Sequence, residues 1–287
     1  MPRRCEVSYS LEETVAAIRD YFEFLTKMYL DESCLQLPPE GGWPEITPER
    51  LRPLGKTDDV VQLLRHIPYL DDSHGRKIYA GPCNIEFYKW PDRIRRTIRS
   101  GHDPAEAFKD FEDMRIITEP YEDWDKGLVP PHVVGLIIVE SWYERFLLDT
   151  KHGIIYWYYC PHGIRHNPTR EPILDDTSDS EASEESSSST AIQEQGEWRT
   201  YPAWPVKDFF ELLKDCLRNL QTVPLSSDNV YDLENHDHFQ DKVVDTMPLI
   251  KEVFWKHGWP NLELYRKEEC LREVNQLVQE KCPEEYL

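Results

Sequence analysis

The sequence predicts an α+β protein in which helices cover an antiparallel sheet and an acidic disordered insertion follows the last strand. Three observations support this fold class. Near both ends of the chain, apolar residues recur every three or four positions, which is typical of helices. The middle of the chain carries short apolar runs bounded by turn residues, which are typical of strands. Between these two regions lies a long acidic segment without apolar periodicity.

Two helices are expected before the sheet. Ser10 and Glu13 form a capping-box pattern at the start of a helix over residues 11–30. Its apolar face consists of Leu11, Val15, Ile18, Phe22, Leu25 and Tyr29. Thr57 predicts the N-cap of a second helix, which ends before Pro68.

The strands are expected between residues 85 and 159. Residues 85–88 alternate between apolar and polar side chains, which suits a half-buried strand. The run 133–139 is apolar on both faces and predicts a central strand. The apolar runs 146–148 and 154–159 are joined by a short polar loop that contains Gly153, so we expect a hairpin.

Three further helices are expected after the acidic segment. The first carries its apolar face at Val206, Phe209, Phe210, Leu213, Leu217 and Leu220. The second carries its apolar face at Leu249, Ile250, Val253 and Phe254, and the last at Leu271, Val274, Leu277 and Val278. Cys270 and Cys282 lie roughly on one face of this last helix, and we expect both to be buried as small apolar residues.

Charge divides the chain into three parts of one expected domain. The 287 residues carry 33 Lys+Arg against 54 Asp+Glu, a net charge of −21. Nine of the acids lie in residues 171–197, which contain no lysine or arginine. A segment of this composition cannot bury enough apolar surface to offset its ordering entropy. We therefore expect an N-terminal part at 1–170, a disordered acidic Ser-rich loop at 171–197, and a C-terminal helical part at 198–287.

The charge and the cysteines restrict the classes of partner and the location. A strongly acidic chain repels nucleic acid and anionic lipid, so neither is expected as a partner. The longest apolar run is too short to span a bilayer. The seven cysteines are widely spaced and form no C-x-x-C pair, a pattern typical of reduced thiols. We expect a cytoplasmic or nuclear protein.

Cys160, His162 and His166 are the best candidate metal ligands. One thiolate and two imidazoles within seven residues could bind zinc, with His152 or a carboxylate as a fourth ligand. The spacing C-x-H-x₃-H is not that of a standard zinc finger, however, and we favour a loop that happens to contain polar rings and a thiol. We expect no metal and no cofactor.

Other groups of polar residues favour structural roles. The chain has no G-x-S-x-G elbow, no phosphate-binding P-loop and no G-x-G-x-x-G fingerprint, so we assign no catalytic residue. His74 with Asp71 and Asp72 reads as a turn, and His236 with His238 reads as a polar loop. The arginines at 93–99 favour an amphipathic surface helix in which they flank two buried isoleucines, Ile94 and Ile98.

Two features point to regulation and binding. Ser178, Ser180 and Ser183 lie among acidic residues and resemble casein-kinase-2 substrates, so they are candidate phosphorylation sites. The chain also contains nine tryptophans and fifteen tyrosines. Most of these should lie in the core, and a few exposed ones would form a protein-binding surface, because aromatic anchors dominate interface hot spots.

Two segments carry a family resemblance. Residues 144–158 (ERFLLDTKHGIIYWY) and 201–220 (YPAWPVKDFFELLKDCLRNL) resemble the SUKH superfamily, which includes fungal cell-wall-assembly regulators and bacterial toxin-immunity proteins. The chain also resembles fungal proteins of uncharacterised function through residues 54–70 (LGKTDDVVQLLRHIPYL) and 257–270 (HGWPNLELYRKEEC). The SUKH resemblance implies an α+β module that binds other proteins and has no catalytic residues.

The expected function is therefore a non-enzymatic protein-interaction or regulatory module. The acidic balance favours a basic or neutral protein partner, and the oligomeric state is left open. The alternative is a hydrolase or transferase with an unrecognised site, possibly assisted by a metal at Cys160, His162 and His166. A converged pocket of titratable side chains would favour the enzyme, whereas an exposed aromatic patch would favour binding.

Overall fold

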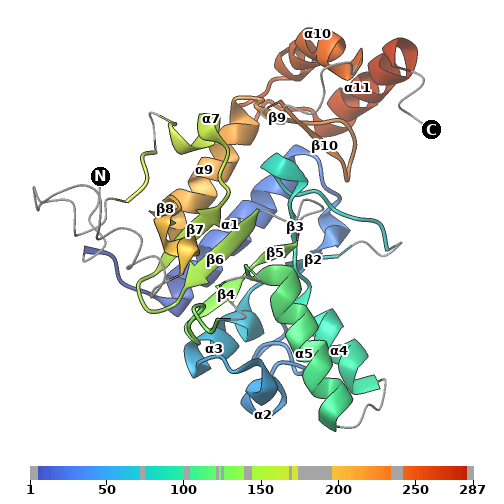
Figure 1. Ribbon diagram of the computed structural model, residues 1–287. Helices are drawn as coiled ribbons and strands as arrows, with labels where there is room; N and C mark the ends of the chain where they lie inside the picture. The colour runs from blue at the N-terminus through green and yellow to red at the C-terminus, as the bar shows by residue number, and fades with distance from the viewer. Residues whose placement is uncertain are drawn as a thin grey trace, which may run out of the picture. The chain divides into compact units, whose positions relative to one another are not determined.

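The computed structural model confirms the α+β class: 50% of it is helical and 14% is strand, with antiparallel sheets (Figure 1). It describes residues 6–71, 75–99, 104–120, 123, 126–138, 144–167, 170–173, 196–233 and 242–282. Most of the expected acidic loop, residues 174–195, lies outside the described residues, as do Ser178, Ser180 and Ser183. In the described part of the chain, no helix is long and apolar enough to cross a membrane.

The α-helices are α1 (Leu11–Met28), α2 (Pro48–Leu51), α3 (Asp58–His66), α4 (Trp90–Arg99), α5 (Pro104–Thr118), α7 (His162–Arg165), α9 (Val206–Arg218), α10 (Lys242–Lys256) and α11 (Lys267–Lys281). Short 3₁₀ helices are η2 (Glu32–Cys34), η3 (Arg52–Leu54), η4 (Pro82–Asn84) and η6 (Glu197–Thr200). The strands are β1 (Leu35–Gln36), β2 (Tyr69–Leu70), β3 (Glu86–Phe87), β4 (Val133–Gly135), β5 (Ile137–Ile138), β6 (Arg145–Asp149), β7 (Ile154–Tyr158), β8 (Ala203–Pro205), β9 (Thr222–Pro224) and β10 (Val230–Asp232).

The chain divides into two compact units, each assembled from three segments. The first unit contains Met1–Arg19, Leu37–Tyr69 and Phe87–Phe210. The second unit contains Asp20–Gln36, Leu70–Glu86 and Glu211–Leu287. The expectation of a single domain stays a prediction.

A four-stranded antiparallel sheet in the order β4-β6-β7-β8 forms the centre of the first unit. The expected hairpin is present, and its register places Phe146 opposite Trp157. Side chains on opposite faces of the sheet alternate along each strand. One face packs Phe146 and Trp157 against Phe209 from the start of α9, with ring centroids 4.7–5.9 Å apart. The other face belongs to a core cluster with Tyr156 and Trp198.

The run 133–139 differs from the expectation of a central strand. It is divided into β4 and β5, and β4 lies at the edge of the four-stranded sheet. The apolar pattern is nevertheless explained, because the end of α5 covers this edge. At Gly135 an added Cβ would lie 1.9 Å from the carbonyl oxygen of Thr118, so only glycine permits this approach. An edge strand covered by a helix is as buried as a central one.

The second unit contains a pair of packed helices, α10 and α11, which lie side by side (Figure 1). Glu273 of α11 joins them by accepting two bonds from Lys256 at 2.7 Å and by pairing with His257 Nε2 at 2.9 Å. These hydrogen bonds lower the pKa of Glu273. As expected, Cys270 and Cys282 are fully buried. Leu249 was expected in the buried face of its helix but is exposed.

The covered edge strand provides a test of the first unit. Replacement of Gly135 by Ala should lower the free energy of unfolding by about 3 kcal/mol, because a buried Cβ would collide with backbone. The matched control is Gly55→Ala, where φ is +69° and nothing lies within 4 Å of an added Cβ. That change should cost only about 1 kcal/mol, because alanine is less stable than glycine in the left-handed conformation. Urea unfolding would measure both, and equal losses would contradict the close approach.

Candidate functional site

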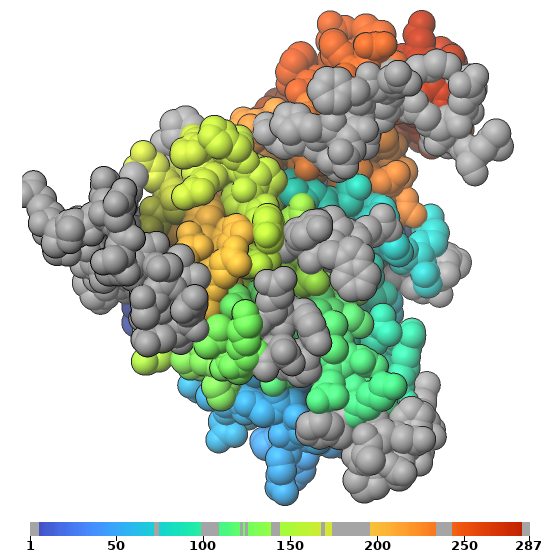
Figure 2. All heavy atoms as spheres, viewed as in Figure 1, coloured from blue at the N-terminus to red at the C-terminus, as the bar shows by residue number. Residues whose placement is uncertain are grey.

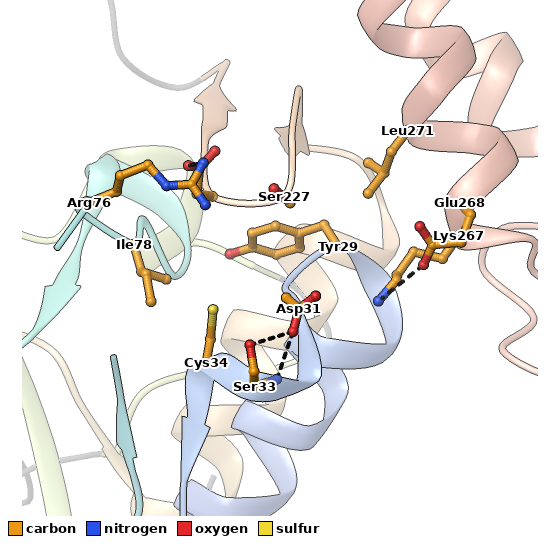
Figure 3. A pocket seen from close by; sticks show the side chains of 11 residues that line it. Tyr29, Asp31, Ser33, Cys34, Arg76, Ile78, Ser227, Lys267, Glu268 and Leu271 are labelled. Carbon is orange, nitrogen blue, oxygen red and sulfur yellow. Dashed lines mark hydrogen bonds and ion pairs between the residues drawn. The ribbon is translucent and has the colours of Figure 1, made fainter. Parts of the chain in front are cut away.

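The second unit contains a pocket of about 200 Å³ (Figure 3). It forms where the end of α1 and η2, the segment before η4, the β9–β10 turn and the start of α11 meet. Its lining residues are Tyr29, Asp31, Ser33, Cys34, Arg76, Ile78, Ser227, Asp228, Lys267, Glu268 and Leu271. Two cations, three carboxylates and a thiol therefore line one cavity, which makes it the first place to look for chemistry.

The acidic side of this pocket is organised by a local turn. Asp31 caps η2 by accepting hydrogen bonds from the Ser33 N–H at 2.8 Å and from the Ser33 hydroxyl at 2.5 Å. These bonds, and more weakly the charge of Lys267, lower the pKa of Asp31. The Tyr29 hydroxyl donates to the carbonyl of Tyr79 at 2.5 Å, and burial raises the pKa of this phenol. Both groups have partners within the fold.

The cations of the pocket are also engaged. Lys267 Nζ donates to the carbonyl oxygens of Thr26 at 3.0 Å and Leu30 at 3.1 Å, at the C-terminus of α1. A helix leaves its last carbonyls without intrahelical donors and carries partial negative charge there, so a lysine stabilises it. Arg76 pairs with Asp228 at 2.7 Å. The charged residues of the pocket are thus best explained as structural contacts that hold segments of the second unit together.

The structure brings His162 and His166 together but does not build a metal centre around them. Both side chains are exposed, His162 at the start of α7 and His166 directly after its end, with ring centroids 4.4 Å apart. The thiol of Cys160 donates to the carbonyl of Pro161 at 3.6 Å. His152, the possible fourth ligand, has its Nδ1 2.8 Å from Asp149. Among the residues that the structure describes, no group of three His, Cys, Asp or Glu side chains could hold a metal ion.

Asp149, His152 and His132 form a cluster that the sequence analysis did not identify. The buried Asp149 carboxylate accepts from the N–H groups of Lys151 at 2.8 Å and His152 at 3.2 Å, and it pairs with His152 Nδ1. His132 Nε2 lies 3.8 Å from the same carboxylate, and burial lowers the pKa of His132. Because the carboxylate closes the β6–β7 turn, the cluster is explained by the hairpin. The i,i+3 spacing of Asp149 and His152 was the available signal.

The remaining candidates do not converge on a site. On α4, Arg95 pairs with Glu45 and Arg96 pairs with Asp92. Of the two isoleucines expected to be buried there, Ile94 is buried, whereas Ile98 is exposed because it falls on the solvent side of the helix. Asp72, His74, His236 and His238 lie outside the described residues.

Exposed apolar side chains gather in one short part of the second unit. Of the eight large hydrophobic side chains that are exposed in the described chain, five lie between residues 244 and 264. They are Val244, Leu249, Trp255, Leu262 and Leu264. Trp255 is 57% exposed and Leu264 is 65% exposed, and Trp255 is the single exposed tryptophan among those that the structure describes.

The helix that carries Trp255 has a separate apolar face for its own core. Val243, Met247, Ile250 and Phe254 are buried at spacings of four, three and four residues. Each of these four residues is followed by one on a second, more exposed side of the helix. These following residues, which have the same spacing, are Val244, Pro248, Lys251 and Trp255. The helix is also held firmly, because buried Trp259 packs on Phe254 and donates its Nε1 hydrogen to the carbonyl of Arg218 at 3.0 Å. The side chains of the exposed face are therefore not required for packing α10 in the core.

No protein-family model, no curated protein and no solved structure matches the chain. The resemblances to the SUKH superfamily and to fungal proteins therefore stay predictions.

If the pocket residues have this structural role, replacing its two cations should have unequal effects on stability. Lys267→Met should lower the free energy of unfolding by about 2 kcal/mol, because buried carbonyls at the end of α1 lose a charged donor. Arg76→Met should change it by less than about 1 kcal/mol, because Arg76 is 56% exposed and forms a surface ion pair. Chemical denaturation of both variants would measure this. A larger loss for Arg76→Met would contradict the interpretation.

The second test concerns zinc. Protein purified without chelator should contain well below one zinc per chain, since the described residues assemble no set of three ligands. His162→Ala should leave the free energy of unfolding within about 0.5 kcal/mol of the native value, as for other exposed side chains. Elemental analysis and thermal unfolding would check both statements. Stoichiometric zinc that is lost together with stability on mutation of Cys160 or His162 would reverse the assignment.

Proposed function

We propose that this protein is a non-enzymatic protein-interaction or regulatory module that binds its partner through α10. The surface consists of Val244, Pro248, Lys251 and Trp255, together with Leu264 from the α10–α11 connection, and is called the Trp255 surface below. Leu264 lies close to Gly258, three residues after Trp255 and just past the end of α10, because an added Cβ at Gly258 would lie 3.2 Å from the Cβ of Leu264.

The observation that carries this proposal is an exposed tryptophan on a stripe of α10 that the helix does not use for its own core. Of the five exposed large hydrophobics between residues 244 and 264, Val244 and Trp255 lie on this stripe, whereas Leu249 lies about 120° around the helix from Trp255. Contiguous exposed apolar surface on a folded protein marks interaction sites. Tryptophan is among the residues most enriched at binding hot spots, where its large ring becomes fully desolvated in the complex. The atoms of α10 and α11 are coloured orange to red in the space-filling view (Figure 2).

Charge supports a partner of a particular kind. The net charge of −21 repels nucleic acid and anionic membranes and attracts basic proteins, so the proposed partner is a basic or neutral protein. The association should weaken as salt rises, because exposed charges are screened. A cytoplasmic or nuclear location and phosphorylation of the acidic serines stay predictions.

The alternative of a hydrolase or transferase with a metal-assisted site has less support. Such an enzyme requires titratable groups that converge on a space where substrate can react. The charged groups of the pocket bond to the protein itself, and Cys160, His162 and His166 are not joined by a further ligand in the described chain. The SUKH resemblance, which implies binding without catalysis, agrees with the leading proposal.

Replacing Trp255 tests the proposal directly. The full-length chain is used to capture proteins from native lysate, and the affinity of each recovered partner is then measured with purified variants. Trp255→Ala should weaken binding of the true partner roughly 30-fold, as expected for a hot spot of about 2 kcal/mol. The free energy of unfolding should stay within about 1 kcal/mol of the native value, because Trp255 is exposed.

The matched control is Ile98→Ala, which truncates another exposed apolar residue on a helix of the first unit. This variant should bind like the native protein. Partners that bind equally to both variants would overturn the assignment of the Trp255 surface. Turnover that is lost on changing one buried His, Cys or Asp without unfolding would overturn the proposed class.

A further inference from the structure

The Trp255 surface has the geometry of a helix-packing seam. Val244, Pro248, Lys251 and Trp255 follow one another at spacings of four, three and four residues. At 3.6 residues per turn these positions fall within an arc of about 60°, and at 1.5 Å per residue they extend about 16 Å along α10. This four-three-four spacing is the one through which α-helices pack lengthwise against each other.

Lys251 gives the seam a charge requirement. It is partly buried at the border between the exposed stripe and the buried face of α10. Among the described residues, no carboxylate pairs with it, whereas the neighbouring Lys256 is paired with Glu273 at 2.7 Å. Burial without a compensating acid lowers the pKa of Lys251. A partly desolvated ammonium of this kind gains most from a carboxylate supplied by a partner.

The other side of the stripe has the opposite charge. Asp245 and Glu252 are exposed and lie about 80–100° around the helix from Val244, on the side away from Lys251. A partner that lies along α10 therefore meets a cation on one flank and two carboxylates on the other. Such an arrangement selects both the kind of element that binds and its direction.

We infer that the element bound at the Trp255 surface is an amphipathic α-helix of another protein, with a carboxylate that faces Lys251 and basic residues that face Asp245 and Glu252. This inference rests on the proposed function and specifies the partner of the same surface. A partner helix of about three turns covers the whole stripe, and its apolar residues at i, i+3 or i+4, and i+7 contact Val244, Pro248 and Trp255.

Selection of displayed peptides with swapped charges tests this inference. A display library of random peptides of about 14 residues, or four helical turns, is selected on the full-length native chain. The selected peptides should carry apolar residues at helical spacing and an acid at one constant position. Lys251→Glu should weaken their binding at least about tenfold, and exchanging that acid for lysine in the peptide should restore it.

Lys109→Glu is the matched control, because it makes the same change of charge at an exposed lysine on α5. It should leave affinity within about twofold. Circular dichroism of a bound, selected peptide should show induced helix. These three results together would support the inference.

Other outcomes separate the inference from the proposed function. Selected peptides that depend on Trp255 but are extended or proline-rich would overturn the helical partner and leave the proposed function standing. Peptides that bind Trp255→Ala as well as the native chain would overturn both. Sedimentation that shows a dimer of the native chain and a monomer of Trp255→Ala would identify a second copy as the occupant, which also overturns the inference.

Discussion

The packing of Phe146, Trp157 and Phe209 is the contact on which the sheet of the first unit depends. The register of the β6–β7 hairpin places Phe146 opposite Trp157, and Phe209 lies against both rings. That register is set in turn by Asp149, whose carboxylate accepts from two backbone N–H groups and closes the turn. A shift by one residue would move every aromatic ring of the hairpin to the other face. Each ring buries roughly 150–250 Å², so the correct register has a large energetic advantage.

A second constraint protects the edge of the same sheet. Glu119, just after α5, is fully buried and pairs with Lys56 at 2.5 Å, while Lys56 also donates to the carbonyl of Val133 in β4 at 2.7 Å. Burial lowers the pKa of Lys56, and the charge of Glu119 opposes this shift. Glu119 also pairs with Arg115 at 3.2 Å, so it keeps a cation if Lys56 is removed. Removing Glu119, in contrast, would leave the buried Lys56 ammonium without a carboxylate, which costs far more than the pair contributes. The pair links the residue after α5 to β4 at this covered edge.

In the proposed function, one helix of the second unit serves both folding and binding. The buried face of α10 includes Ile250 and Phe254, and Glu273 of α11 holds the far end of the helix. Folding therefore does not require Val244 or Trp255, which remain exposed. An exposed tryptophan has a cost in solubility that a partner can remove by covering it. This is the physical basis for the proposal that α10 binds the partner and that the pocket at the start of α11 has a structural role.

The sequence by itself determined the local elements of this protein. The capping pattern at Ser10, the apolar spacing of α9 and the polar turn before Gly153 predicted a first helix, a later helix and a hairpin, and all three are present. These patterns succeed because helix periodicity, strand alternation and turn chemistry depend on residues that are close in the chain. The α+β class followed from their order.

Only the tertiary structure decided which apolar residues are buried. The apolar run 133–139 was expected to be a central strand, yet it begins with an edge strand that α5 covers. Leu249 is apolar and was expected in the core, yet it faces solvent. The proximity of His132 to Asp149 and the lack of a carboxylate partner for Lys251 among the described residues could likewise not be predicted. Burial and such ion pairing depend on residues that are distant in sequence. For this reason the sequence could predict that some exposed aromatic residues form a binding surface. Only the tertiary structure, which shows which tryptophans are buried, could single out Trp255.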